Sequence, residues 1–128
     1  MFEINKQLEN DSIFIVKLKL CQLRLMKDGE LDWFLLIPER ENISEWFELE
    51  QKDQNLLSEE IVTVSSFLKK EGRADKINVA NLGNIVSQFH VHIIGRKKTD
   101  RAWPSPIWGT KSTKIFSPDH ILFWQKFF

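Results

Sequence analysis

Hydrophobic and polar residues alternate along positions 87–96, which read SQFHVHIIGR. This period of two is typical of a β-strand, in which successive side chains point to opposite faces of a sheet. One side carries Phe89, Val91 and Ile93, and the other carries Gln88, His90 and His92. An apolar side is expected to face a core, but two imidazoles and a carboxamide in a row are unusual on the other side. We therefore predict that the polar face of this strand carries the chemistry of the protein.

Four other segments have the pattern of strands. They span 12–18, 21–26, 32–37 and 75–82. The sequence KDGE at 27–30 predicts a turn, so the second and third segments form a hairpin. The apolar run DWFLLI at 32–37 is ended by Pro38, and its composition predicts a strand inside the sheet.

The clearest helix spans about 52–70, where apolar residues recur at spacings of three and four and form one stripe. A short second helix is expected after Ser117, with Pro118 at its first position. The predicted fold class is therefore α+β, with an antiparallel sheet, one long helix packed on it and a short C-terminal helix. On this fold the histidine face is the uncovered face of the sheet, or a groove on it.

Composition narrows the classes of protein that fit. The 128 residues suit one compact domain, and 18 basic residues balance 18 acidic ones, so no net charge attracts nucleic acid or a membrane. Cys21 is the only cysteine, which excludes an intrachain disulfide. The first residues are polar, and no apolar run approaches the length of a membrane span. A cytoplasmic protein without a membrane or nucleic-acid partner is expected.

The polar strand face is compatible with four kinds of role. The histidines can be half-exposed polar residues without a function, or they can bind an anionic ligand. They can also bind zinc, but a zinc site needs three or four protein ligands, and only His120 and Cys21 remain as further histidine or cysteine ligands. In the fourth role, a neutral imidazole attacks phosphorus, because its ordinary pKa of about 6.5 leaves it nucleophilic near neutral pH.

The same residues resemble a known motif. Positions 88–94, read as Gln-Phe-His-Val-His-Ile-Ile, resemble the histidine triad His-φ-His-φ-His-φ-φ (φ, apolar) of the HIT nucleotide hydrolases and transferases, with Gln88 in place of the first histidine. The sequences FLLIPER at 34–40, GN at 83–84 and AWP at 102–104 are similar to further stretches of that family. WPSPIWG at 103–109 resembles the bacterial branch written Q-x-H-x-H. The resemblance covers about residues 10–104 and implies a HIT-like domain at 1–104, with a C-terminal extension at 105–128.

The resemblance implies a catalytic mechanism. His90 takes the place of a nucleophile that attacks the α-phosphorus of a nucleotide and forms a nucleotidyl-histidine, which water or another acceptor then cleaves. His92 takes the place of the residue that contacts the phosphate. Gln88 can donate a hydrogen bond to a phosphate oxygen but cannot pass a proton to a leaving group. The implied substrates are dinucleoside polyphosphates or nucleoside phosphoramidates; no metal is required, although Mg²⁺ can accompany a polyphosphate.

Four further residues are candidates for substrate binding. Asn84 takes the place of a phosphate-binding glutamine, although it is equally a common turn residue. Leu25 stands near the ribose-binding position of relatives, so Asp28 in the turn is the expected substitute. Asn78 on the preceding strand and Trp103 beside the pocket complete the set.

Two departures from the family pattern keep a second function open. Gln88 stands at the first triad position, and Trp33 stands where relatives carry a helper histidine. With both helpers replaced, the same groove can belong to a nucleotide-binding module with little or no catalytic activity.

A homodimer is also implied, because relatives are usually two-fold dimers built on the long helix and a sheet edge. The strand at 75–82 has no internal proline, and the residues after 102 include seven Trp and Phe side chains. We expect part of this tail to pack across the two-fold axis; the alternative is that it covers only its own sheet.

Overall fold

The computed structural model describes residues 1–128. Its strands are β1 (Ser12–Lys17), β2 (Cys21–Met26), β3 (Asp32–Pro38), β4 (Lys76–Ala80) and β5 (Val91–Arg96). Its helices are α1 (Lys6–Asp11), the 3₁₀ helix η1 (Trp46–Glu48), α2 (Gln51–Lys70) and α3 (Pro118–Gln125). The strands form one antiparallel sheet in the order β1-β2-β3-β5-β4. The predicted α+β fold is confirmed, including the β2–β3 hairpin and the central place of β3.

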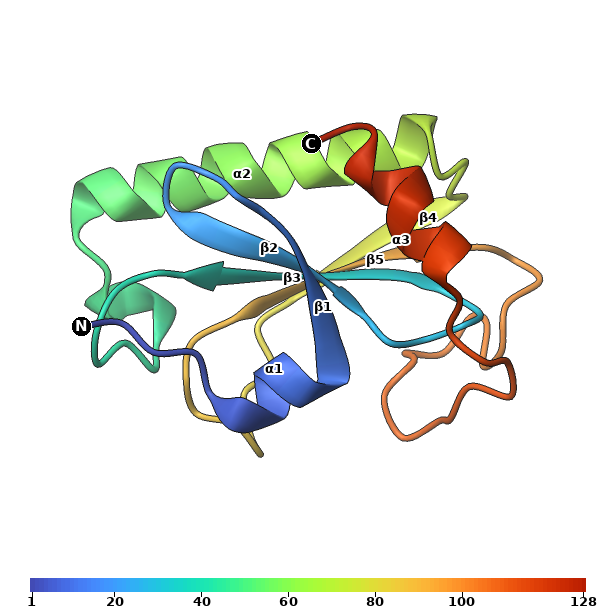
Figure 1. The fold of residues 1–128 in the computed structure, drawn as a ribbon, viewed down its shortest axis with the longest axis horizontal. Coiled ribbons are helices and arrows are strands. Elements are labelled where there is room, and N and C mark those ends of the chain that lie inside the picture. The colour runs from blue at the N-terminus through green and yellow to red at the C-terminus, as the bar shows by residue number, and fades with distance from the viewer.

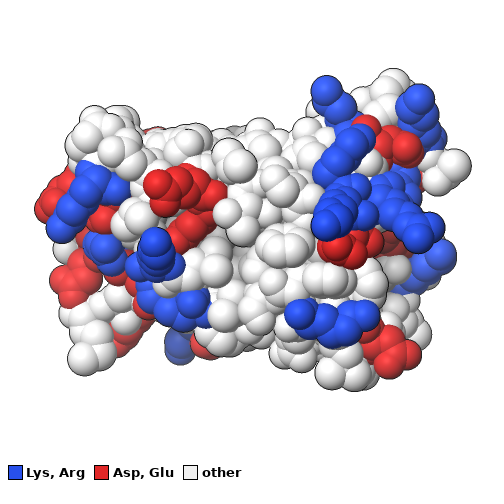
Figure 2. All heavy atoms as spheres, turned by 90° about the horizontal axis from the view of Figure 1, so that it is seen from above, with Lys and Arg blue, Asp and Glu red and all other residues white.

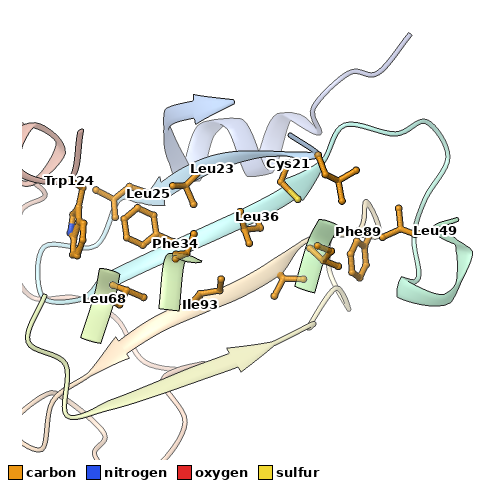
Figure 3. Close-up of a cluster of buried hydrophobic side chains, with 14 residues drawn as sticks. Cys21, Leu23, Leu25, Phe34, Leu36, Leu49, Leu68, Phe89, Ile93 and Trp124 are labelled. Carbon is orange, nitrogen blue, oxygen red and sulfur yellow. The ribbon is translucent and has the colours of Figure 1, made fainter. Parts of the chain in front are cut away.

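The main core lies between the sheet and α2, which runs along one face of it (Figure 1). Alternate residues of the strands point toward this helix and are fully buried, as Figure 3 shows for Leu23, Leu25, Phe34, Leu36 and Ile93. Leu57, Val64 and Leu68 supply the apolar stripe of α2 that packs against them. Because strand side chains alternate, the intervening residues of the same strands face the other side of the sheet.

That second face is covered in part by α1 and by the loop that follows β5 (Figure 1). Helix α1 was not predicted from the sequence; it begins after Asn5, whose side-chain oxygen accepts hydrogen bonds from the amides of Gln7 and Leu8. Leu8 packs against Leu35 and Ile37 of β3. This helix forms one wall of the space in which the histidines lie.

The C-terminal tail packs against its own chain. Trp124 of α3 is completely buried in the main core and contacts Phe34 edge-on, at 5.2 Å between ring centroids (Figure 3). Phe127 and Phe128 pack against the same core. This arrangement corresponds to the alternative in which the tail covers its own sheet, at least for these three side chains.

The strand that carries the histidines is shorter than predicted. It begins at Val91, so Gln88 and His90 precede it and only His92 lies within it. The strict alternation of the sequence therefore does not place all three polar side chains on one strand face. No helix in the chain combines the length and apolar character that crossing a membrane requires.

Candidate active site

A cavity of about 420 Å³ opens on the sheet face opposite α2. Its walls come from α1, from β2 and β3, from the segment before β5 and from the loop after β5. The lining residues are Gln7, Leu8, Asp11, Met26, Trp33, Leu35, Leu82, Asn84, Ile85, Val86, His90, His92, Trp108 and Gly109. The cavity is mostly apolar, with a few polar groups that converge on it, which is the usual composition of a small-molecule site.

His90 is held with one ring nitrogen fixed. Its Nδ1 lies 2.7 Å from the backbone carbonyl oxygen of Gln88. A carbonyl only accepts, so Nδ1 carries the proton and Nε2 keeps its lone pair. The side chain is 3% exposed, and burial lowers its pKa below the ordinary 6.5 although the Gln88 carbonyl acts in the opposite direction. His90 is therefore a neutral imidazole at neutral pH, with Nε2 as its nucleophilic atom.

His92 is held as the opposite tautomer, with its proton on the other ring nitrogen. The indole Nε1 of Trp33 donates to its Nδ1 at 3.0 Å, so the proton of the neutral ring lies on Nε2. Nε2 is buried and has no hydrogen-bond partner; the Leu82 carbonyl forms no bond of normal geometry with it. Burial and the neighbouring His90 together lower the pKa of His92 to about 4, and the Leu82 carbonyl opposes them. His92 thus lines the cavity and carries a buried N–H donor without a hydrogen-bond partner.

The two rings stand side by side. Their centroids are 4.9 Å apart, in an edge-on arrangement. One ring presents a lone pair and its neighbour presents an N–H. Such a pair can attack an electrophilic phosphorus while stabilising negative charge on its oxygens.

Two tryptophans build the wall beside His92. Trp108 contacts its ring edge-on at 5.2 Å and contacts Trp33 at 5.9 Å. The sequence motif at 103–109 contains both Trp103 and Trp108, and it is Trp108 that lines the cavity. The family pattern marks Trp33 only as the replacement of a helper histidine and gives no sign of the hydrogen bond that its indole N–H donates to His92.

Gln88 is not where the alternation placed it. Its side-chain amide donates to the Glu3 carbonyl and accepts from the Asn5 amide, both at 2.8 Å, and it does not line the cavity. The prediction that its side chain lies beside His90 is wrong, because the strand begins only at Val91. Its backbone carbonyl contacts His90 instead, while its side chain fastens the segment that leads into α1.

Three other candidates lie in a separate cluster. Asp28 accepts two hydrogen bonds from Arg101, at 3.2 and 2.6 Å, and two more from the amides of Glu30 and Leu31. Asn78 accepts from Arg96 at 3.1 Å, and the guanidinium of Arg96 lies over the ring of Trp103 at 5.6 Å. None of the three lines this cavity within the single chain.

Asn84 does lie at the cavity, where it is an exposed residue of the rim. The only carboxylate in the cavity wall belongs to Asp11 at the end of α1, and its Oδ2 accepts from the Gln7 amide at 2.8 Å. No signal in the sequence points to Asp11 or Gln7, because the sequence pattern does not predict α1. Two polar residues of the cavity wall, Gln7 and Asp11, thus come from a helix that only the fold reveals.

No group of three or more His, Cys, Asp or Glu side chains is arranged to hold a metal ion. The two extra ligands that a zinc site would have needed lie elsewhere. Cys21 is buried on the α2 side, where burial and Glu60 raise the pKa of its thiol, and His120 contacts Asp32 at 2.7 Å.

Comparisons with known proteins give a consistent result. A family model described as HIT domain matches residues 7–99. A crystal structure of a histidine triad protein from Sinorhizobium meliloti is 42% identical, with 98% of this chain and 93% of that chain covered and a TM-score of 0.93. One from Bradyrhizobium japonicum is 36% identical, with the same coverage and TM-score. A hypothetical histidine triad nucleotide-binding protein from Sulfolobus tokodaii is 22% identical, covers 94% and 83%, and shares the fold at a TM-score of 0.68. No curated protein gives a significant match.

Proposed function

The chain belongs to the HIT domain family, and we propose that it is a nucleotide phosphoesterase that cleaves at a nucleoside α-phosphate through His90. The observation that carries this proposal is the pair of oppositely fixed rings in one cavity. Nε2 of His90 has a lone pair because the Gln88 carbonyl holds the proton on Nδ1, and Nε2 of His92 has an unused N–H. The substrate class is a dinucleoside polyphosphate or a nucleoside phosphoramidate.

In the first step, Nε2 of His90 forms a bond to the α-phosphorus. The bond from phosphorus to the leaving oxygen or nitrogen breaks, and its electron pair departs with the leaving group, which takes a proton from solvent. The attacking ring becomes cationic and keeps its Nδ1 proton, so the Gln88 carbonyl at 2.7 Å stabilises the new charge. The hydrogen bond to this carbonyl becomes stronger in the transition state, and the carbonyl does not have to move.

In the second step, water attacks the same phosphorus. The N–P bond breaks, its electron pair returns to Nε2 of His90, the proton of the water is released to solvent, and a nucleoside monophosphate is left. Burial and the neighbouring His90 lower the pKa of the His92 ring to about 4, so this ring enters the reaction in its neutral form. Its Nε2–H donates to an oxygen of the phosphorus, where negative charge develops.

The rest of the cavity suits a nucleotide. Leu8, Ile85 and Val86 supply apolar surface for a base. Asp11, with Gln7 beside it, is the acceptor available for sugar hydroxyls, in the role that the sequence suggests for Asp28. Mg²⁺ would enter only with a polyphosphate substrate.

The test is a substrate panel. Wild-type protein is incubated with a dinucleoside polyphosphate and with a nucleoside phosphoramidate, and release of the monophosphate is followed by chromatography. His90→Gln is expected to lower turnover by about 10³-fold or more, because it removes the nucleophile. His120→Gln changes a histidine outside the cavity and should retain wild-type turnover. Undiminished turnover in His90→Gln would exclude the proposed nucleophile.

A nucleotide-binding module is the second candidate. It is favoured by the absence of an ionisable acid beside His90 that could protonate a leaving group, since the pKa of His92 lies at about 4 and Gln88 faces away. Calorimetry would then show binding of nucleoside monophosphates, with no turnover of any substrate in the panel. Turnover that depends on His90 would exclude this candidate.

We also propose that the protein acts as a homodimer. Strand β4 lies at an edge of the sheet with Val79 exposed, and neighbouring α2 exposes the uncharged side chains of Val62, Thr63 and Ser66. Seen from the α2 side, the middle of the molecule is uncharged between two charged ends (Figure 2). Light scattering should give twice the chain mass for wild type and Val62→Ala, and a monomer for Val62→Asp. A monomeric wild type at micromolar concentration would overturn this part of the proposal.

A further inference from the structure

Nearly all buried side-chain polar atoms of this protein have a hydrogen-bond partner. Only two buried side-chain polar atoms lack a partner, Oγ of Ser65 in α2 and Nε2 of His92. Buried donors without a partner are costly, so each one needs a reason. The reason for His92 lies in the residue that holds its other nitrogen.

We propose that Trp33 is a positioning residue: its indole N–H fixes His92 in the tautomer that carries the proton on Nε2, so that a hydrogen-bond donor faces a phosphate bound at His90. The proposal rests on the proposed function for the identity of the ligand. The geometry that carries it is the 3.0 Å hydrogen bond from Nε1 of Trp33 to Nδ1 of His92, together with the unpartnered Nε2 at the other side of the ring.

An indole suits this task because it can only donate. Its N–H has no lone pair and does not titrate, so the nitrogen that it contacts must be the unprotonated one. A histidine at the same position could donate or accept, and its partner could then adopt either tautomer. The indole also occupies the lone pair that a second proton on His92 would need, and so it keeps the ring neutral. Trp33 therefore supplies a fixed direction of donation.

The indole is itself held in place. Trp33 lies on β3 in register with Ile94 of β5, two residues from His92 along that strand. It is buried in a small apolar cluster with Leu31, Ile94 and Ile107, and Trp108 packs edge-on against it. A side chain packed in this way keeps one rotamer, so the direction of its N–H is set before any ligand binds.

The test compares Trp33→Phe with Trp108→Phe. Both replace an indole of the same aromatic wall, buried at Trp33 and partly buried at Trp108, but only the first removes the hydrogen bond to His92. Long-range ¹H–¹⁵N spectra of protein labelled on histidine nitrogen report the tautomer and pKa of each ring. Wild type and Trp108→Phe should show His92 neutral, with the proton on Nε2. Trp33→Phe should show mixed tautomers and a pKa of His92 raised by about one unit or more.

Kinetics supply the second readout. Trp33→Phe is expected to lower kcat about tenfold or more with KM within about threefold of wild type, and to move the acid limb of the pH profile upward. Trp33→His restores a donor and should recover part of kcat. If Trp33 contributed only packing, kcat would fall by a similar factor in Trp33→Phe and Trp108→Phe, and the tautomer of His92 would stay unchanged.

Two results would overturn the proposal. One is a wild-type spectrum with the proton of His92 on Nδ1, which needs no variant and therefore stands even if Trp33→Phe does not fold. The other is an unchanged tautomer and pKa in Trp33→Phe. The spectra are recorded without substrate, so absence of turnover in wild type would count against the proposed function and not against the role of Trp33.

Discussion

Two buried polar clusters lie on the same face of the sheet and differ in one respect. Strand β5 carries His92 and, four residues later, Arg96, on the face opposite α2. Arg96 donates three hydrogen bonds, two to Asp100 and one to Asn78. His92 receives one hydrogen bond on Nδ1 and leaves Nε2 unused. Each nitrogen of the Arg96 guanidinium has a hydrogen-bond partner, and in this sense the cluster around Arg96 is saturated, whereas the cluster around His92 is not.

This difference distinguishes polar residues that stabilise the fold from polar residues that are free to bind a ligand. Asp28 and Arg101 belong to the saturated cluster; burial alone would raise the pKa of the Asp28 carboxyl, but hydrogen bonds from Arg101 and from backbone amides outweigh it and lower the pKa below its ordinary value. A carboxylate occupied in this way has no capacity left for a ligand. The histidine cavity keeps a lone pair on His90 and an N–H on His92, which is what a reacting group needs.

The largest expected effect is a loss of stability when the saturated cluster is broken. Asp28→Asn removes the charge that accepts two hydrogen bonds from Arg101 and leaves Glu30 as the only carboxylate paired with this guanidinium. Because two charge-assisted hydrogen bonds are weakened, the free energy of unfolding should fall by about 3–5 kcal/mol. Urea-induced unfolding followed by tryptophan fluorescence measures it. Glu59→Gln on the exposed side of α2 serves as the control, and its effect should stay within about 0.5 kcal/mol.

The same variant should leave nucleotide affinity per folded molecule unchanged, because Asp28 does not line the cavity. If Asp28→Asn instead lost affinity while keeping its stability, the distinction between the two clusters would fail.

A smaller effect is expected from His92, which makes the stability of the protein depend on pH. His92 has a pKa of about 4 in the fold against 6.5 when unfolded, so the unfolded chain takes up a proton first as the pH falls. Its contribution to stability is complete above pH 6.5 and is lost between 6.5 and about 4. At about 1.4 kcal/mol for each pKa unit, the loss is about 3 kcal/mol. His90, whose pKa is also lowered by burial, acts in the same direction.

Urea unfolding at pH 7, 5.5 and 4 checks this prediction. His92→Gln should flatten the dependence of unfolding free energy on pH. An equally steep dependence in that variant would mean that His92 is not buried as a neutral ring.

The smallest effect concerns Gln88. Its side chain fastens residues 3–5 ahead of α1, so Gln88→Ala should loosen one wall of the cavity and raise KM or the nucleotide Kd severalfold, by about 1 kcal/mol, with kcat little changed. Gln88→His cannot make both backbone hydrogen bonds and should also weaken binding. Gln51→Ala, at the exposed start of α2, is the control. A rise in kcat on Gln88→His would show that this residue acts in the chemistry.

The sequence predicted the elements more reliably than the contacts of the site. Strand and helix patterns located β2, β3 and α2 to within a residue or two, because each buries a continuous apolar face. His90 and His92 could be chosen because they were polar residues in an apolar frame. Both line the cavity.

The remaining site residues depend on tertiary contacts that no local pattern encodes. Asp28 was indistinguishable from a ligand-binding acid until Arg101, 73 residues away, was seen to pair with it. For Trp33 the opposite holds: the sequence gives no sign of a role in the site, because that role depends on a hydrogen bond to His92 across the β3–β5 pair. Asp11 and Gln7 reach the cavity through a six-residue helix whose apolar pattern is too short to recognise.

The measurement that tests the central claim most directly is a search for the covalent intermediate. Protein mixed with a dinucleoside polyphosphate or a nucleoside phosphoramidate is quenched, digested at a pH that preserves N–P bonds, and analysed by mass spectrometry. The account predicts a nucleoside monophosphate adduct on the peptide that contains Phe89–Val91, absent from His90→Gln and retained in His120→Gln. Turnover in wild type without any adduct on His90, or an adduct that persists in His90→Gln, would contradict it.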